Sequence, residues 1–252
     1  MRALIALVLG CLCCASGPAD AAEARQKALH FTDPERGREV PVHLYLSSPD
    51  KACTAATPCP VAFISPGYGI AHTEYSFIAA SLAEQGYLVA AIQHDLPSDP
   101  PLPRTGDLIE ARTPMWRRGA ENLRFVRRQL SKDFPGYAWS DLTLIGHSNG
   151  GDISAFALQV SPDLGRTLVT LDNRRVPLPR TAGLRVLSVR ASDFSADPGV
   201  LPTEAEQSAT GACIVQIPAS RHNDMHDEGP MPLRERTWTL IEDFLKHHRC
   251  GA

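Results

Sequence analysis

The sequence has little net charge and no apolar run long enough to span a membrane. Lys and Arg number 25 and Asp and Glu number 28, a formal net charge of −3. This balance lacks the basic excess of nucleic-acid-binding proteins and gives no attraction to an anionic membrane surface. No internal repeat or low-complexity tract is present. Of the 252 residues 43% are hydrophobic, so we expect residues 22–252 to form one domain with a sizeable core.

The N-terminus has the features of a signal peptide over residues 1–21. Arg2 supplies a positive charge, Ala3 to Leu12 form an apolar stretch, and Ala19-Asp20-Ala21 is a small-x-small cleavage site. The apolar stretch is too short to cross a bilayer as a stable helix. We therefore expect export to the periplasm or the medium. Lipid attachment at Cys11 is an alternative, although its apolar region would be very short.

The cysteines that remain after cleavage suit an oxidising compartment. Of the seven cysteines in the chain, Cys53, Cys59, Cys213 and Cys250 remain, an even number that predicts two disulfides. Cys53 and Cys59 flank a short loop and are expected to pair. Pairing of Cys213 with Cys250 would tie the last helix to the sheet. None of the four has Cys-x-x-Cys spacing, and we expect neither a metal nor a cofactor.

Strand and helix patterns alternate along the chain. Short apolar runs predict buried strands at residues 61–65, 87–92, 142–145, 167–171, 184–189 and 214–217. An alternating pattern over Val40 to Leu46 predicts an edge strand. Helical patterns cover residues 73–85, 114–131, 151–158 and 234–247. Together these patterns predict an α/β fold with a mostly parallel central sheet, flanked by helices on both faces.

One segment joins a strand to a helix through Gly-x-Ser-x-Gly. The strand at 142–145 ends in Gly146-His147-Ser148-Asn149-Gly150, and a helical pattern follows. In this order the motif is typical of a nucleophile elbow, a strained turn that pushes a serine hydroxyl outward. Side chains at positions 146 and 150 would crowd the neighbouring strand and helix. Ser148 is therefore the predicted nucleophile, and the alternative is an ordinary glycine-rich turn.

A serine nucleophile needs a base within hydrogen-bond reach. His222 lies a few residues beyond the last predicted strand and is the predicted base, with His226 as a second candidate. Together with Asp224 or Asp227 these histidines could also bind a metal, but no third cluster of ligands accompanies them.

The base in turn needs an acid that orients it. Asp172, Asp193 and Asp197 all follow strands and all suit the chain order serine, aspartate, histidine. Asp172 follows its strand directly, which would hold its carboxylate rigidly near the elbow. The alternative role for Asp172 is an ion pair with Arg174 or Arg175.

Two backbone amides are candidates for an oxyanion hole. The amide of Asn149 follows the nucleophile, and the tight loop Ser65-Pro66-Gly67-Tyr68-Gly69 follows the strand at 61–65. We assign the amide of Tyr68 as the second donor. The alternative is a simple glycine-rich turn.

With these motifs the chain resembles the α/β-hydrolase superfamily. Within it, the chain is similar to the plasma-type platelet-activating-factor acetylhydrolases and their bacterial dienelactone-hydrolase-like relatives. The resemblance rests on residues 63–69, 74–76, 82–94, 144–151, 171–172 and 221–223. In that family the acid follows the strand after the elbow helix, which implies Asp172. Many other α/β-hydrolases place the acid one strand later, which would favour Asp193 or Asp197.

The resemblance also departs from the family pattern. Pro66 stands where histidine is common before the oxyanion glycine. The lipid-surface segments of the animal enzymes have no counterpart, so a phospholipid substrate does not follow. We expect an exported serine hydrolase that cleaves small carboxylic esters through an acyl-enzyme. Amides, peptides or polyesters are alternative substrates of the same triad, and a non-catalytic binding protein on this fold is an alternative of another class.

Overall fold

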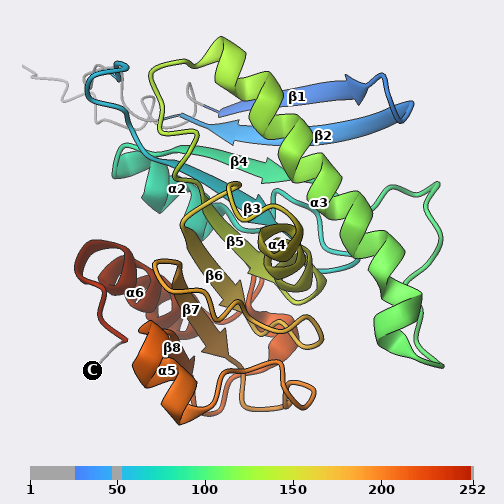
Figure 1. Ribbon diagram of the computed structural model, residues 1–252, viewed down its shortest axis with the longest axis vertical. Coiled ribbons are helices and arrows are strands. Elements are labelled where there is room, and N and C mark those ends of the chain that lie inside the picture. The colour runs from blue at the N-terminus through green and yellow to red at the C-terminus, as the bar shows by residue number, and fades with distance from the viewer. Residues whose placement is uncertain (1–25, 47–52, 251–252) are drawn as a thin grey trace, which may run out of the picture.

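An eight-stranded sheet forms the centre of the computed structural model, which describes residues 26–46 and 53–250. The strand order is β1-β2-β4-β3-β5-β6-β7-β8 (Figure 1). The strands are β1 Gln26–Asp33, β2 Arg38–Tyr45, β3 Val61–Ser65, β4 Leu88–Ile92, β5 Thr143–His147, β6 Thr167–Leu171, β7 Arg185–Arg190 and β8 Cys213–Gln216. Pairing is antiparallel between β1 and β2 and between β2 and β4, and parallel elsewhere. The predicted signal peptide and Cys11 lie outside the described residues.

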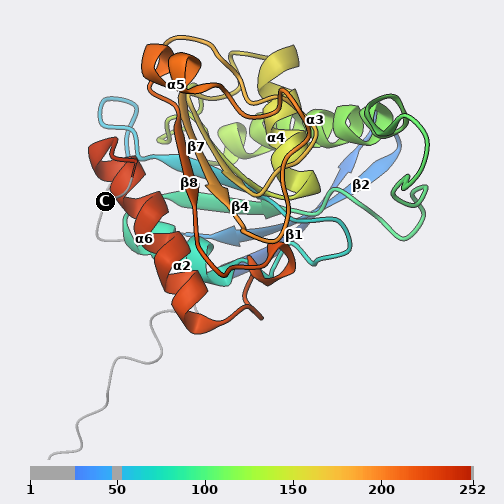
Figure 2. The same ribbon diagram turned by 90° about the horizontal axis from the view of Figure 1, so that it is seen from below.

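Helices cover both faces of the sheet. They are α2 Ser76–Glu84, α3 Leu108–Asp133, α4 Asn149–Val160, α5 Glu204–Thr210 and α6 Met231–His247, with a short 3₁₀ helix, η1, at His222–Asp224. One core packs α3 and α4 against the sheet, and a second core packs α2 and α6 against its other face (Figure 2). Buried apolar side chains on both faces explain why the parallel strands are continuous apolar runs. The predicted α/β fold is confirmed.

Two details of the predicted secondary structure are wrong. The strand at Val40 to Leu46 is present as β2 but is not an edge strand, because β1 pairs along its outer side. The helix predicted from Pro114 begins at Leu108, where the side chain of Asp107 accepts hydrogen bonds from two backbone amides of the first turn. This cap stabilises a start that precedes the proline.

The register of the parallel strands gathers their carboxyl ends in one row. Ser65 pairs with Gly146, Leu171 pairs with both His147 and Val189, and each of these residues ends or nearly ends its strand. The residues that follow these strands therefore emerge side by side. In open α/β sheets this edge is where ligands bind.

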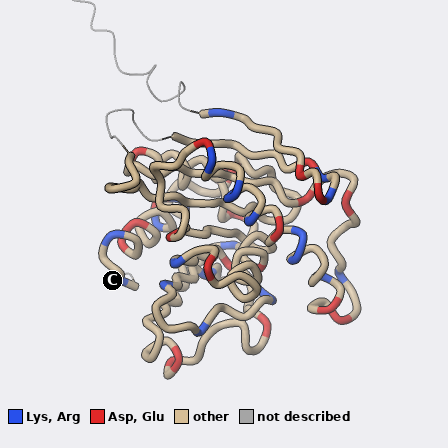
Figure 3. The backbone as a smooth tube through the Cα atoms, turned by 45° about the horizontal axis from the view of Figure 1, so that its top comes forward, with Lys and Arg blue, Asp and Glu red and all other residues tan. Residues whose placement is uncertain are grey.

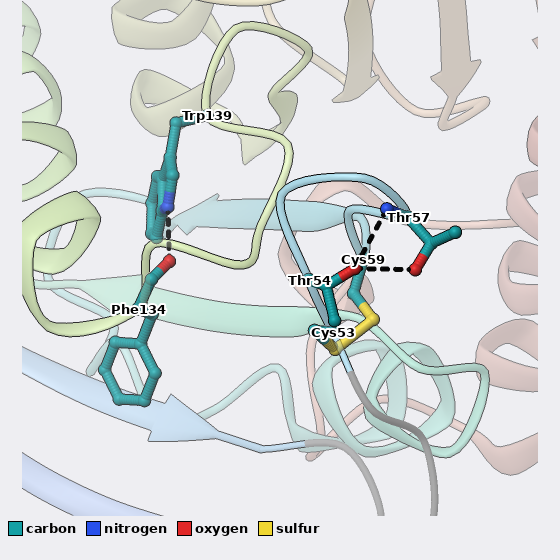
Figure 4. Close-up of a disulfide and its surroundings, with 6 residues drawn as sticks. All are labelled: Cys53, Thr54, Thr57, Cys59, Phe134 and Trp139. Carbon is teal, nitrogen blue, oxygen red and sulfur yellow. Dashed lines mark hydrogen bonds between the residues drawn. A yellow bond between two sulfur atoms is a disulfide. The ribbon is translucent and has the colours of Figure 1, made fainter.

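Both expected disulfides are present. Cys53 bonds to Cys59 across a separation of 6 residues, beside the Thr54–Thr57 turn drawn in Figure 4. Cys213 at the start of β8 bonds to Cys250 across a separation of 37 residues. The second bond joins the segment after α6 to the edge of the sheet. Within the described part of the chain, no helix has the length and apolar character required to cross a membrane.

Removal of the Cys213–Cys250 bond should destabilise the protein more than removal of the Cys53–Cys59 bond. On the chain-entropy argument the longer loop contributes about 4 kcal/mol and the shorter loop about 2 kcal/mol. Urea denaturation of the two paired Cys→Ala variants measures both losses. A larger loss from the short loop would contradict this ranking.

Two histidines are buried close to the carboxyl ends of the strands. His94 follows β4 and is 1% exposed, and His147 ends β5 and is 2% exposed. Burial disfavours the charged imidazolium and lowers the pKa of each ring to about 3. Both rings are therefore neutral in the folded protein at neutral pH.

These histidines should make the protein less stable in mild acid. Between pH 6.5 and pH 3 the unfolded chain binds protons that the folded chain does not, so stability falls as the pH falls. From pH 7 to pH 5.5 the two rings together should lower the free energy of unfolding by about 2–3 kcal/mol. Denaturation of wild type, His147→Gln and the exposed control His30→Gln measures this. The His147 change should remove about 1 kcal/mol of the fall, because His43 and His72, whose pKa values burial also lowers, contribute to the remainder. Equal falls in all three proteins would contradict the assignment.

Candidate active site

The turn between β5 and α4 is held by close backbone contacts. A Cβ atom at Gly146 would lie 2.3 Å from the carbonyl oxygen of Gly150. A Cβ atom at Gly150 would lie 2.2 Å from the carbonyl oxygen of Ser65 at the end of β3. Ser148, between these glycines, has φ 51° and ψ −119°, a conformation that is costly for a residue with a side chain. The turn therefore has the strained geometry expected of a nucleophile elbow.

Ser148, His222 and Asp172 form one hydrogen-bonded chain. The Oγ atom of Ser148 lies 2.9 Å from Nε2 of His222. The Nδ1 atom of His222 lies 2.5 Å from Oδ2 of Asp172. Ser148 is partly exposed, His222 is 7% exposed and Asp172 is fully buried. A hydroxyl, an imidazole and a carboxylate in this order can move a proton from the hydroxyl to the ring.

Asp172 is positioned by its own backbone and by a buried arginine. The residue has φ 54°, and its amide donates to the carbonyl of Val189 at 2.8 Å. The Oδ1 atom of its carboxylate accepts from the amide of Ala191 at 3.2 Å and lies 2.7 Å from Nη2 of Arg190. The other oxygen is left for His222. The pairing of Leu171 with Val189 places residues 172 and 190 beside each other.

The other two candidate acids have different partners. Asp193 accepts a hydrogen bond from the backbone amide of His222 at 2.8 Å, so it anchors the loop and not the ring. Asp197 forms an ion pair with Arg175 at 2.7 Å. Arg174 and Arg175, the two arginines considered as partners for Asp172, do not form an ion pair with it.

The residues after His222 also take structural roles. The Nδ1 atom of His226 accepts a hydrogen bond from the backbone amide of Glu228. The carboxylate of Asp224 forms an ion pair with Arg221 at 3.8 Å. The carboxylate of Asp227 accepts the amides of the first two residues of α2 at 2.8 and 3.1 Å, which ties this loop to a helix N-terminus. In residues 26–46 and 53–250 no group of three or more metal-binding side chains occurs.

A second buried chain of hydrogen bonds runs behind the nucleophile. The Nε2 atom of His147 lies 2.9 Å from the backbone carbonyl of His222, so this nitrogen carries the proton. Its Nδ1 atom must then accept from the hydroxyl of Tyr75, 2.8 Å away. The same hydroxyl accepts from the amide of Gly67 at 2.9 Å. The chain therefore connects the loop after β3 to the loop that carries His222.

Both candidate oxyanion donors belong to residues that line the cavity at Ser148. The cavity has a volume of about 280 Å³, and its walls include Tyr68 and Asn149. Asn149 is the first residue of α4, where a backbone amide has no partner within the helix. Its side-chain oxygen accepts a hydrogen bond from Nε1 of Trp116 at 3.0 Å, which fixes the side chain against α3. A larger cavity of about 610 Å³, between β2 and α3, contains none of these residues.

Three supporting residues were not predicted from the sequence. Arg190 carried a usable signal, because a charged residue that ends an apolar strand needs a buried partner. Tyr75 and His147 lie in segments on which the family resemblance rests, but nothing in the sequence indicated their contact, which joins segments 72 residues apart.

Comparisons by sequence found no relative of this chain. No family model matches this chain, and no curated protein resembles it in sequence. Solved structures do resemble it. The ferulic acid esterase from Streptomyces cinnamoneus has 20% identity and a TM-score of 0.56, with 86% of this chain and 81% of the other covered.

Two further structures agree over most of their length. The dienelactone hydrolase from Anabaena variabilis has 14% identity and a TM-score of 0.58, covering 88% of this chain and 97% of its own. Thermogutta terrifontis esterase 2, phosphorylated by paraoxon, has 12% identity and a TM-score of 0.63, and the match covers 89% of this chain and 95% of the esterase. At these identities the likeness shows architecture alone. The chain therefore has the α/β-hydrolase fold.

Proposed function

We propose that this protein is an exported serine hydrolase that cleaves carboxylic esters. The observation that carries the proposal is the chain of hydrogen bonds from Ser148 through His222 to Asp172, with distances of 2.9 and 2.5 Å. The strained backbone of Ser148 adds to it, because strain of this kind persists where a function requires it.

In the first half of the reaction, Ser148 attacks the acyl carbon of the ester. His222 takes the hydroxyl proton at Nε2 and then gives it to the oxygen of the leaving alcohol. Asp172 holds the ring through Nδ1, so that Nε2 faces the serine. The products of this half are an acyl-enzyme on Ser148 and a free alcohol.

The amides of Tyr68 and Asn149 are the proposed oxyanion donors. Each donor of this kind stabilises the transition state by about 3 kcal/mol. In the second half of the reaction, water attacks the acyl-enzyme while His222 takes its proton. The same proton then returns to Ser148, and the carboxylic acid leaves. These steps need no cofactor.

Two features favour esters over amides, peptides or polyesters. The solved structures similar to this chain are a ferulic acid esterase, a dienelactone hydrolase and a further esterase. The cavity of about 280 Å³ suits a small substrate. A panel of p-nitrophenyl esters, matched anilides and polymer films separates these classes.

Export is supported by two independent features. The N-terminal pattern with cleavage after Ala21 is one. The two disulfides are the other, since such bonds form and persist in oxidising compartments.

Substitutions in the proposed triad should abolish turnover without unfolding the protein. Ser148→Ala should lower kcat for a p-nitrophenyl ester by about 10⁵-fold or more, because no other nucleophile is in place. Asp172→Asn should lower kcat by about 10⁴-fold, because the amide stabilises the wrong tautomer of His222.

The two other aspartates provide matched controls for this measurement. The kcat of Asp197→Asn should stay within about threefold of the wild-type value, because Asp197 pairs with Arg175 and does not contact His222. Asp193→Asn should lower kcat by only about tenfold, because the neutral side chain can still accept a hydrogen bond from the amide of His222. A crippled Asp197→Asn beside a nearly silent Asp172→Asn would overturn the assignment of the acid.

A further inference from the structure

The cavity at Ser148 is lined by more arginines than carboxylates. Four guanidinium side chains contribute to its wall: Arg104, Arg112, Arg174 and Arg175. Asp152 is the one carboxylate in the same wall. Over the described residues as a whole, basic and acidic residues are interspersed along the backbone (Figure 3). Positive charge therefore exceeds negative charge in the wall of this cavity.

Little of this positive charge is neutralised by the protein. Arg175 pairs with Asp197 at 2.7 Å. The carboxylate of Asp152 is buried and accepts three backbone amides, those of residues 174, 175 and 176, at 3.2, 2.9 and 2.9 Å. Among the described residues, no carboxylate lies within 4 Å of the guanidinium nitrogens of Arg104, Arg112 or Arg174.

Two of these arginines are held in place by neutral groups. The guanidinium of Arg174 stacks 3.9 Å above the ring of Phe194, which also lines the cavity. The Nε atom of Arg112 donates to the carbonyl of Pro103 at 3.0 Å. The Nε atoms of Arg174 and Arg175 are buried and have no hydrogen-bond partner among the described residues. Burial and the nearby charge of Arg175 lower the pKa of Arg112, and the carboxylates of Asp152 and Asp197 oppose this only in part.

The larger cavity between β2 and α3 provides a contrast. It also contains arginines, but Arg36 contacts Asp33 at 2.6 Å and Arg38 contacts Asp99 at 2.6 Å. Arg118 lies 3.3 Å from Asp95. Three of the four arginines in this cavity are thus paired with carboxylates, and the fourth, Arg117, is exposed. Of the arginines beside Ser148, Arg104, Arg112 and Arg174 lack such partners, as expected where an anionic ligand is to supply them.

We propose that the ester cleaved at Ser148 carries a second, anionic oxygen group, and that Arg112 and Arg174 bind it. This inference rests on the proposed function, because it names the class of ester that the same cavity takes. A carboxylate is the smallest such group and matches the planar fork of a guanidinium. The neutral ring of Phe194 beside Arg174 suits the apolar atoms that join the carboxylate to the ester.

Two pairs of esters test this inference, one pair for each side of the scissile bond. The first is 4-carboxyphenyl acetate with its methyl ester, and the second is mono-4-nitrophenyl adipate with its methyl ester. Wild type, Arg112→Gln, Arg174→Gln and the double variant are assayed with each pair. Arg124→Gln, an exposed arginine on α3 outside the cavity, is the control. The readout is the ratio of kcat/KM for the anionic ester to kcat/KM for its neutral partner, which cancels differences in the amount of folded enzyme.

For at least one pair, wild type should favour the anionic ester by about tenfold or more. Each cavity variant should lower that ratio by about tenfold, mainly through KM, and Arg124→Gln should leave it unchanged. Equal rates on both members of each pair in wild type would overturn this inference and leave the proposed function standing. A preference that survives the double variant would overturn the assignment to these arginines. No turnover of any of the four esters would count against both proposals.

Discussion

The backbone crowding around residues 146–150 is the constraint on which the site depends. β5 can turn into α4 at this point only if positions 146 and 150 carry no side chain, since a Cβ at either would meet a carbonyl oxygen within 2.3 Å. The close approach brings the end of β3 against the start of α4 and leaves Ser148 with a positive φ of 51°. The nucleophile, the amide of Asn149 and the loop of Tyr68 are consequently brought to one cavity.

The candidate base is held by contacts on several sides. Asp172 contacts one nitrogen of the His222 ring, Asp193 accepts from its amide, and His147 donates to its carbonyl. Because His147 is neutral, it can donate to a carbonyl without bringing a competing charge next to the ring of His222. The expected cost of burying this imidazole is a lower free energy of unfolding in acid. Its benefit is a fixed distance between the base and the serine.

Much of the fold could be predicted from the sequence, and so could the three residues that the structure brings together at the candidate site. The short apolar strands and the glycines of the elbow act locally, and their consequences follow from a few neighbouring residues. β1 was missed because its sequence, with Lys27 and His30 facing solvent, lacks the apolar content of the other strands. The early start of α3 was missed because Pro114 is a stronger signal in the sequence than the cap at Asp107.

The supporting contacts of the site depend on tertiary structure. Residues 75 and 147 meet across 72 residues of chain, and Arg190 meets Asp172 through the register of β6 and β7. The choice among Asp172, Asp193 and Asp197 was likewise open, since all three follow strands. Only the direction in which each carboxylate leaves the backbone separates them. For Asp172 that direction depends on a left-handed φ of 54°, which the residue type does not reveal.

The central claim is that Ser148 is an activated nucleophile. Treatment of the protein with paraoxon, followed by digestion and mass spectrometry of the peptides, tests this directly. We expect one diethyl phosphate on the peptide that contains Ser148, formed at pH 8 and absent when the protein is first denatured. A protein that stays unmodified, or a modification on another residue, would contradict the account.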